Sequence, residues 1–172
     1  KGVGALYVRE GIEFQKLQDG GHQEKDKRAG TENIAEIVGL GKAIENIYLK
    51  YDKYNSHLQT LRDFYIEQIE QKIPEAKLNG DRKNRLPGNA NFSFPNINQQ
   101  LLLDLDEIGI CASAGSACST GNALPSHVLT AIGIPNYMIE GSLRTTFGKD
   151  NTKEEVEILV NSIEKMIKNI NN

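Results

Sequence analysis

The sequence predicts an α/β chain whose C-terminal part is a small α+β domain, with helices packed on a small sheet. Three features indicate this fold class. Apolar residues recur every three or four positions from Asn33 to Ile69, two short segments at residues 90–94 and 142–147 suit strands, and an amphipathic segment follows Thr152. A chain of 172 residues can bury a hydrophobic core between such elements.

The first residues of the chain suit a strand. Residues 3–8 are mostly apolar, and a polar, glycine-rich stretch around Gly20 follows them. The chain has no initiator Met and opens almost inside this strand-like run. We therefore expect it to be a piece of a longer protein.

A long helix is predicted to start at Asn33. Asn33 with Glu36 three residues later is the cap-plus-acid pattern of a helix N-terminus. The apolar repeat continues until Pro74 stops it. Because the repeat is longer than a typical helix of a globular protein, we expect a break or kink near residues 50–56. A helix of this length is typical of a bridge between two lobes.

A strand, a helix and a second short strand are expected before the cysteine-containing loop. Residues 90–94 alternate apolar and polar side chains and end at Pro95. Asn98 suits the N-cap of the leucine-rich helix that follows and ends at Gly109. Residues 110–112 have the character of a short strand.

The last part of the sequence predicts helix, strand and helix. Ser126 caps a short helix through Ile132, and residues 142–147 form a strand. Thr152 and Glu155 form a capping box at the start of the final helix. Apolar residues at helical spacing make up its predicted core face: Val156, Leu159, Val160, Ile163, Ile167 and Ile170.

The composition narrows the classes of function. There are 20 basic and 23 acidic residues, a net charge of -3, so direct binding of nucleic acid is not expected. The apolar runs are too short to span a membrane. With two cysteines and three histidines, the spacing does not indicate a metal site. A chain this poor in cysteine is expected to be cytoplasmic and reduced.

Cys118 is the candidate nucleophile. It lies in a run of Ala, Ser and Gly, with no bulky neighbour to bury it. A thiol on such a loop can approach a substrate and react there as the thiolate. The alternative is a small residue that fills a tight turn. Cys111, between Ile110 and Ala112, is expected to be buried for packing.

Two further stretches carry candidate binding residues. Arg144 lies in a strand-like segment, where its planar fork suits a carboxylate; the alternative is a structural salt bridge with Glu140 or Asp150. Residues 28–33 lead into the long helix and suit a phosphate, with a hydroxyl at Thr31. Helix capping alone would also explain this stretch.

Together these motifs resemble the C-terminal part of a cysteine desulfurase of the NifS/IscS type, a fold-type I enzyme that uses pyridoxal 5'-phosphate (PLP). The matching stretches occur in family order and at family spacing over nearly the whole chain. They are residues 1–8, Arg28-Ala-Gly-Thr-Glu-Asn33, Ala114-Gly-Ser-Ala-Cys118, Pro125-Ser-His-Val-Leu129 and Ser142-Leu-Arg144.

The resemblance implies a role for each candidate. The cysteine that matches Cys118 attacks the sulfur of PLP-bound L-cysteine, releases L-alanine and keeps a persulfide for an iron–sulfur scaffold or a tRNA-thiolation protein. Arg144 binds the substrate carboxylate, and Thr31 reaches the cofactor phosphate of the other subunit of a homodimer. Residues 1–50 would end the large PLP-binding domain and begin the bridging helix, and residues 51–172 would be the small domain that carries the cysteine loop.

The resemblance also marks what differs. The family's Schiff-base lysine lies upstream of the segment that matches Lys1, so this chain alone is expected to be inactive. His22 and Asp26 stand where the family has glycines, which bears on the loop at the cofactor edge. Two alternatives stay open: a non-catalytic sulfur-relay or scaffold-docking module, and another fold-type I PLP enzyme such as a class V aminotransferase.

Overall fold

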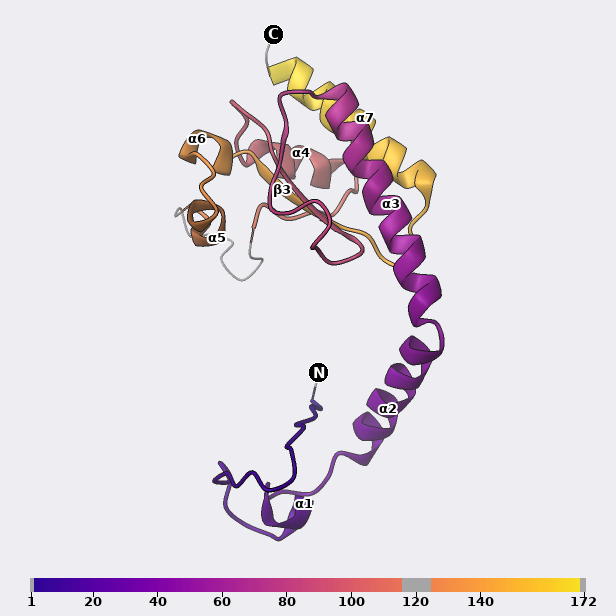
Figure 1. Cartoon of the computed structure of the whole chain (residues 1–172), viewed down its shortest axis with the longest axis vertical. Helices are drawn as coiled ribbons and strands as arrows, with labels where there is room; N and C mark the ends of the chain where they lie inside the picture. The colour runs from indigo at the N-terminus through magenta and orange to yellow at the C-terminus, as the bar shows by residue number, and fades with distance from the viewer. Residues whose placement is uncertain (1, 116–124, 171–172) are drawn as a thin grey trace. The chain divides into compact units, whose positions relative to one another are not determined.

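The computed structural model describes residues 2–115 and 125–170. The chain divides into two compact units, residues 1–51 (unit 1) and residues 52–172 (unit 2). Figure 1 shows the helices and strands of each unit along the chain. Within the described ranges, no helix is both long enough and apolar enough to cross a membrane.

Unit 1 contains two helices, α1 (Gln23–Asp26) and α2 (Ile34–Leu49). The predicted start of α2 is confirmed, because the Asn33 side chain accepts a hydrogen bond from the Glu36 backbone N–H at 3.4 Å. The predicted strand at residues 3–8 is wrong, since this stretch has no regular structure. A strand must pair its backbone groups with a neighbour, and no strand of unit 1 is present among the described residues to do so.

The predicted break in the long helix is confirmed. Helix α2 ends at Leu49 and α3 (Tyr51–Lys72) begins two residues later, so Lys50 marks the interruption. The Lys50 N–H turns back to the Ile47 carbonyl at 3.2 Å. Helix α3 ends just before Pro74, because a proline disfavours helical geometry at the preceding residue.

Unit 2 is built on a three-stranded antiparallel sheet in the order β1 (Lys77–Leu78), β2 (Asn89–Ser93) and β3 (Ser142–Thr146). The two predicted strands are confirmed as β2 and β3. Strand β1 was not predicted, because two residues are too few to show alternation. The predicted strand at residues 110–112 is wrong: only the next residue, Ser113, forms an isolated bridge, to Arg144.

The two faces of the sheet differ in polarity. Paired residues of β2 and β3 share a face, as Phe92 does with Leu143 and Asn91 with Arg144. The core face, which includes Phe92 and Leu143, contacts α3, α4 (Gln100–Glu107) and α7 (Lys153–Ile170). The opposite face, here called the polar face, consists of polar residues of β2 and β3: Asn89, Asn91, Ser93, Ser142, Arg144 and Thr146.

Side chains cap the helices of unit 2 largely as predicted. Thr152 and Glu155 exchange the two hydrogen bonds of a capping box, at 3.0 and 3.3 Å. Asn98 accepts from the Gln100 N–H at 2.8 Å, although the N-cap position itself is Gln99. The described core residues of α7 are buried as expected: Val156, Leu159, Val160, Ile163 and Ile167. The predicted fold class is therefore confirmed.

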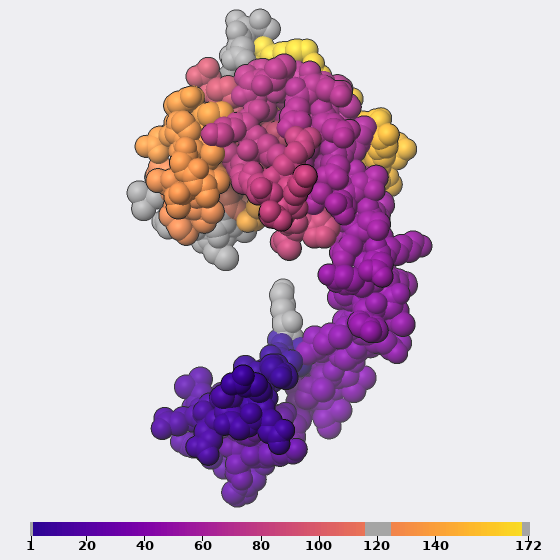
Figure 2. Space-filling view, in the orientation of Figure 1, coloured from indigo at the N-terminus to yellow at the C-terminus, as the bar shows by residue number. Residues whose placement is uncertain are grey.

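Helices α5 (His127–Ala131) and α6 (Asn136–Ile139) form a small satellite of unit 2. Ser126 caps α5 as predicted, accepting from the Leu129 N–H at 3.4 Å. The satellite has its own apolar cluster: Leu129, Ile134, Met138 and Ile139. Figure 2 shows its surface in orange at one side of unit 2.

Candidate functional site

Arg144 lies at the centre of β3 on the polar face and is half-buried. Its side chain forms no hydrogen bond or ion pair with another described residue. Of the acidic partners expected under the alternative, Asp150 pairs with Lys149 at 2.5 Å, and Glu140 is exposed without an ion pair to Arg144. As far as the described residues are concerned, the guanidinium is therefore available to an external anion.

The surroundings of Arg144 favour an anion over a cation. None of the six residues of the polar face is acidic. Asn91, the register partner of Arg144, accepts a hydrogen bond from the Asn79 side-chain amide at 2.6 Å. Asn79 is 5% exposed, and its Oδ1 has no hydrogen-bond partner among the described residues. Arg144 thus stands beside neutral amides, which leave its charge available.

The segment that leads to Cys118 is fastened to β3 beside Arg144. The Arg144 N–H donates to the Ser113 carbonyl at 2.6 Å, and the Ser113 N–H donates to the Arg144 carbonyl at 3.2 Å. The Ser142 hydroxyl donates to the Ala114 carbonyl at 2.9 Å. Cys118 itself lies outside the described residues, three positions after Gly115.

Cys111 corrects one prediction, because it is exposed and not buried. Its neighbours Ile110 and Ala112 both pack against the core of unit 2. In an extended chain alternate side chains point in opposite directions, so the residue between two inward ones points outward. Cys111 is therefore an accessible thiol in the connection between α4 and Ser113.

Thr31 lies in unit 1, before the N-terminus of α2, and is exposed. Asn33 caps this helix, and Thr31 forms no hydrogen bond with another residue that the structure describes. A hydroxyl before the N-terminus of a 16-residue helix suits a phosphate, because helix N–H groups and the helix dipole attract anions. These features fit the phosphate end of PLP.

Helix α1 was not predicted and has unusual backbone geometry. Glu24, Lys25 and Asp26 have φ values of 50°, 55° and 63°, in the left-handed region that L-residues rarely adopt. The His22 ring nitrogen Nδ1 lies 2.5 Å from an Asp26 carboxylate oxygen. Asp26 thus takes a conformation that glycine favours, and the His22 contact supports it.

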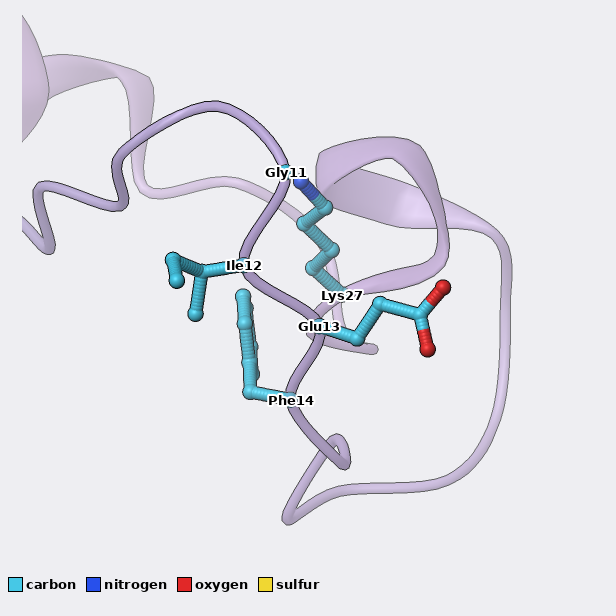
Figure 3. Close-up of a pocket in the computed structure, with 5 residues that line it drawn as sticks. All are labelled: Gly11, Ile12, Glu13, Phe14 and Lys27. Atoms are coloured by element: carbon cyan, nitrogen blue, oxygen red, sulfur yellow. The ribbon is translucent and has the colours of Figure 1, made fainter.

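An open pocket of unit 1 contains none of the candidate residues. It is lined by Gly11, Ile12, Glu13, Phe14 and Lys27 (Figure 3). The Lys27 ammonium lies 5.7 Å from the centre of the Phe14 ring. In this view Ile12 and Phe14 lie side by side, and Glu13 points to the other side of the backbone. The residues that line this pocket include no thiol or hydroxyl nucleophile.

The sequence reasoning missed Ser113, Ser142 and Asn91 as neighbours of Arg144. Ser142 could have been found, since it lies two residues before Arg144 in a predicted strand and therefore shares its face. The contact of Ser142 with Ala114 could not, because it joins residues 28 positions apart.

Comparisons with known proteins identify the family of this chain. The sequence matches the aminotransferase class-V family over residues 1–159. A cysteine desulfurase IscS from Dictyoglomus turgidum is 47% identical over 171 residues, covering 99% of this chain and 43% of that protein. One from Clostridium botulinum is 50% identical over 171 residues, covering 98% and 43%.

Solved structures of NifS-like proteins also match this chain. A NifS-like protein superposes with a TM-score of 0.81 at 29% identity, and the match covers 94% of this chain and 41% of that protein. The chain thus spans less than half the length of the relatives that it matches.

Proposed function

The chain belongs to the aminotransferase class-V family, and we propose that it is the C-terminal part of a PLP-dependent cysteine desulfurase. The reaction converts L-cysteine to L-alanine and leaves a persulfide on Cys118. The observation that carries this proposal is the position of Arg144. Its guanidinium has no partner among the described residues, and its backbone is hydrogen-bonded to Ser113, in the segment that continues to Cys118. Relatives that match almost all of this chain are themselves named cysteine desulfurases.

Arg144 binds the carboxylate of the amino-acid substrate in this proposal. A guanidinium donates two parallel hydrogen bonds to a carboxylate, which fixes the orientation of the ligand as well as its charge. The absence of acidic residues from the polar face keeps this charge uncompensated. Arg144 would therefore contribute to substrate binding without first breaking an internal ion pair.

Cys118 receives the sulfur. Its thiolate attacks the sulfur of L-cysteine, so a new S–S bond forms while the Cβ–S bond breaks. The carbon keeps the electron pair of the broken bond and takes up a proton, which gives L-alanine. Enzyme thiol and L-cysteine thus become enzyme persulfide and L-alanine, with no external oxidant.

The cofactor would be held in part by Thr31, whose exposed hydroxyl precedes the N-terminus of α2 and suits the phosphate. When bound, PLP supplies the electron sink for carbanion chemistry at the amino acid. The resemblance implies that the lysine that forms the Schiff base with PLP lies upstream of Lys1. We further propose that the longer protein is a homodimer and passes the persulfide sulfur to an iron–sulfur scaffold or a tRNA-thiolation protein.

The test uses the longer protein that carries this chain, loaded with PLP and supplied with L-cysteine. We expect equal amounts of L-alanine and transferable sulfur, and we expect Cys118→Ser to abolish both, while Cys111→Ser retains them. A protein that accepts sulfur on Cys118 but forms no alanine would be a relay module. Alanine or amino transfer that persists in Cys118→Ser would indicate another class V enzyme; either result contradicts the proposal.

A further inference from the structure

We infer that Ser142 is a positioning residue, which holds the entry of the Cys118 segment on the strand that carries Arg144. This inference rests on the proposed function, in which Arg144 binds the substrate carboxylate and Cys118 attacks its sulfur. It assigns Ser142 no contact with substrate or cofactor. It concerns only the junction of residues 113–115 with residues 142–144, called here the strand–loop junction.

Three sets of contacts build the strand–loop junction. Backbone hydrogen bonds join Ser113 and Arg144 in both directions, at 2.6 and 3.2 Å. The Ser142 hydroxyl donates to the Ala114 carbonyl at 2.9 Å. The Ser113 hydroxyl donates to the Gly115 carbonyl at 3.0 Å and accepts from the Gly115 N–H at 3.4 Å. Every residue from 113 to 115 is thus held by at least one hydrogen bond.

The Ser142 contact is the only side-chain bond from β3 to this segment within the described ranges. Ser142 is 5% exposed, so water does not readily replace its partner. Ser142 and Arg144 are two residues apart on one strand and therefore point to the same face. The group that fixes the segment and the group that binds the carboxylate consequently share one rigid element.

This arrangement has a consequence for the reaction. The rate of a reaction between two groups depends steeply on how well their relative positions are fixed. The strand–loop junction fixes the position of the chain as far as Gly115, three residues before Cys118. The backbone of Arg144 forms one side of this junction. Loss of the Ser142 bond should therefore reduce delivery of the thiol to a carboxylate ligand, while the affinity of Arg144 for that carboxylate remains.

The test uses alkylation, which needs neither PLP nor L-cysteine. Iodoacetate carries a carboxylate that Arg144 can bind, whereas iodoacetamide of nearly the same size does not. Both reagents transfer a carbon to the thiolate and release iodide. The rate ratio of iodoacetate to iodoacetamide is measured by peptide mass spectrometry at Cys118. Cys111, an exposed free thiol on the same 172-residue chain, provides the internal reference.

We expect a higher ratio at Cys118 than at Cys111, and Ser142→Ala should lower the Cys118 ratio about fivefold, the effect of one net hydrogen bond. Ser142→Thr keeps the hydroxyl and should have the same Cys118 ratio as the unaltered chain. Ser93→Ala is the matched control: Ser93 is the register partner of Ser142, is fully buried and has no bond to residues 113–115. It should leave the ratio unchanged.

Several results would overturn the inference. One is an equal ratio at the two cysteines of the unaltered chain, and another is an unchanged ratio in Ser142→Ala. A loss of the same size in Ser93→Ala would indicate a general structural effect. If Ser142→Ala fails to unfold cooperatively, Ser113→Ala tests the same junction from the other side. Alanine formation in the longer protein, with wild-type Ser142, tests the proposed function separately.

Discussion

Arg144 and Ser113 exchange two backbone hydrogen bonds, at 2.6 and 3.2 Å, although they are 31 positions apart in the chain. The pair joins the strand that carries the open guanidinium to the segment that continues to Cys118. Only the backbone of Arg144 takes part, so its side chain remains available for a ligand. Substitution of the Arg144 side chain can therefore test its role in ligand binding without breaking these two backbone hydrogen bonds.

Arg144→Gln should impair substrate use without unfolding the protein. The side chain has no ion pair with another described residue to lose, so the free energy of unfolding should change by less than about 0.5 kcal/mol. Loss of a charge-assisted, two-point contact should lower kcat/KM for L-cysteine about 100-fold in the PLP-loaded longer protein. Arg144→Lys keeps the charge but not the two-point geometry of the guanidinium. Its kcat/KM should lie between those of the unaltered protein and Arg144→Gln. An unchanged kcat/KM in Arg144→Gln would remove this residue from the site.

Gly141→Ala should destabilise unit 2 strongly. A Cβ at Gly141 would clash with the carbonyl oxygen of Phe94 and would lie 2.8 Å from that of Ile97. Because both obstacles are backbone atoms, they cannot rotate away, and we expect a loss of about 3 kcal/mol by denaturant unfolding. Gly148→Ala is the control, since its Cβ would meet nothing closer than the Asn151 side chain at 3.6 Å. Equal effects of the two substitutions would contradict this explanation.

Tyr65 should make the fold sensitive to alkali. Burial raises the pKa of the Tyr65 phenol to about 12 from its usual 10.0, with a smaller opposing effect from the Thr145 hydroxyl bond. The unfolded chain therefore releases this proton first, and stability is present in full below pH 10 and lost as the pH rises to about 12. The loss from this group should approach about 3 kcal/mol. Tyr65→Phe should remove that part of the decline, measured by urea unfolding from pH 9 to 12.

Glu155 should make the last helix sensitive to acid. Hydrogen bonds from the Asn151 side chain and then from the Thr152 N–H lower the pKa of the Glu155 carboxyl from its usual 4.5. Its contribution is therefore present above pH 4.5 and is lost as the pH falls through the lower folded-state value. Thr152→Ala, which removes the other half of the box, should cost about 1 kcal/mol at neutral pH. Glu155→Gln should flatten the acid limb of the stability profile, and an unaltered acid limb would contradict the assignment.

Local patterns predicted most of the helices and strands from the sequence. Asn33, Ser126 and Thr152 start helices in the structure because capping depends on residues three positions apart. Strands β2 and β3 were found because their alternation reflects one buried and one polar face. The break at Lys50 followed from the length of the apolar repeat alone.

The failures involve contacts that a local pattern does not contain. Residues 3–8 have the composition of a strand but no pairing strand in unit 1 within the described residues. Cys111 was expected inside because its neighbours are apolar, yet burial of those neighbours turns it outward. The contacts of Ser113 and Ser142 depend on the approach of distant segments. The roles of Cys118, Arg144 and Thr31 stay predictions, since no contact among the described residues tests them.

The central claim is that Cys118 carries the sulfur, and its most direct test locates the persulfide. The PLP-loaded longer protein is incubated with L-cysteine, blocked with a persulfide-selective reagent and digested for peptide mass spectrometry. The account predicts one added sulfur atom on the Cys118 peptide, none on the exposed Cys111, and about 100-fold slower labelling of Cys118 in Arg144→Gln at low L-cysteine. A persulfide on Cys111 instead, or none on Cys118 while alanine is produced, would contradict it.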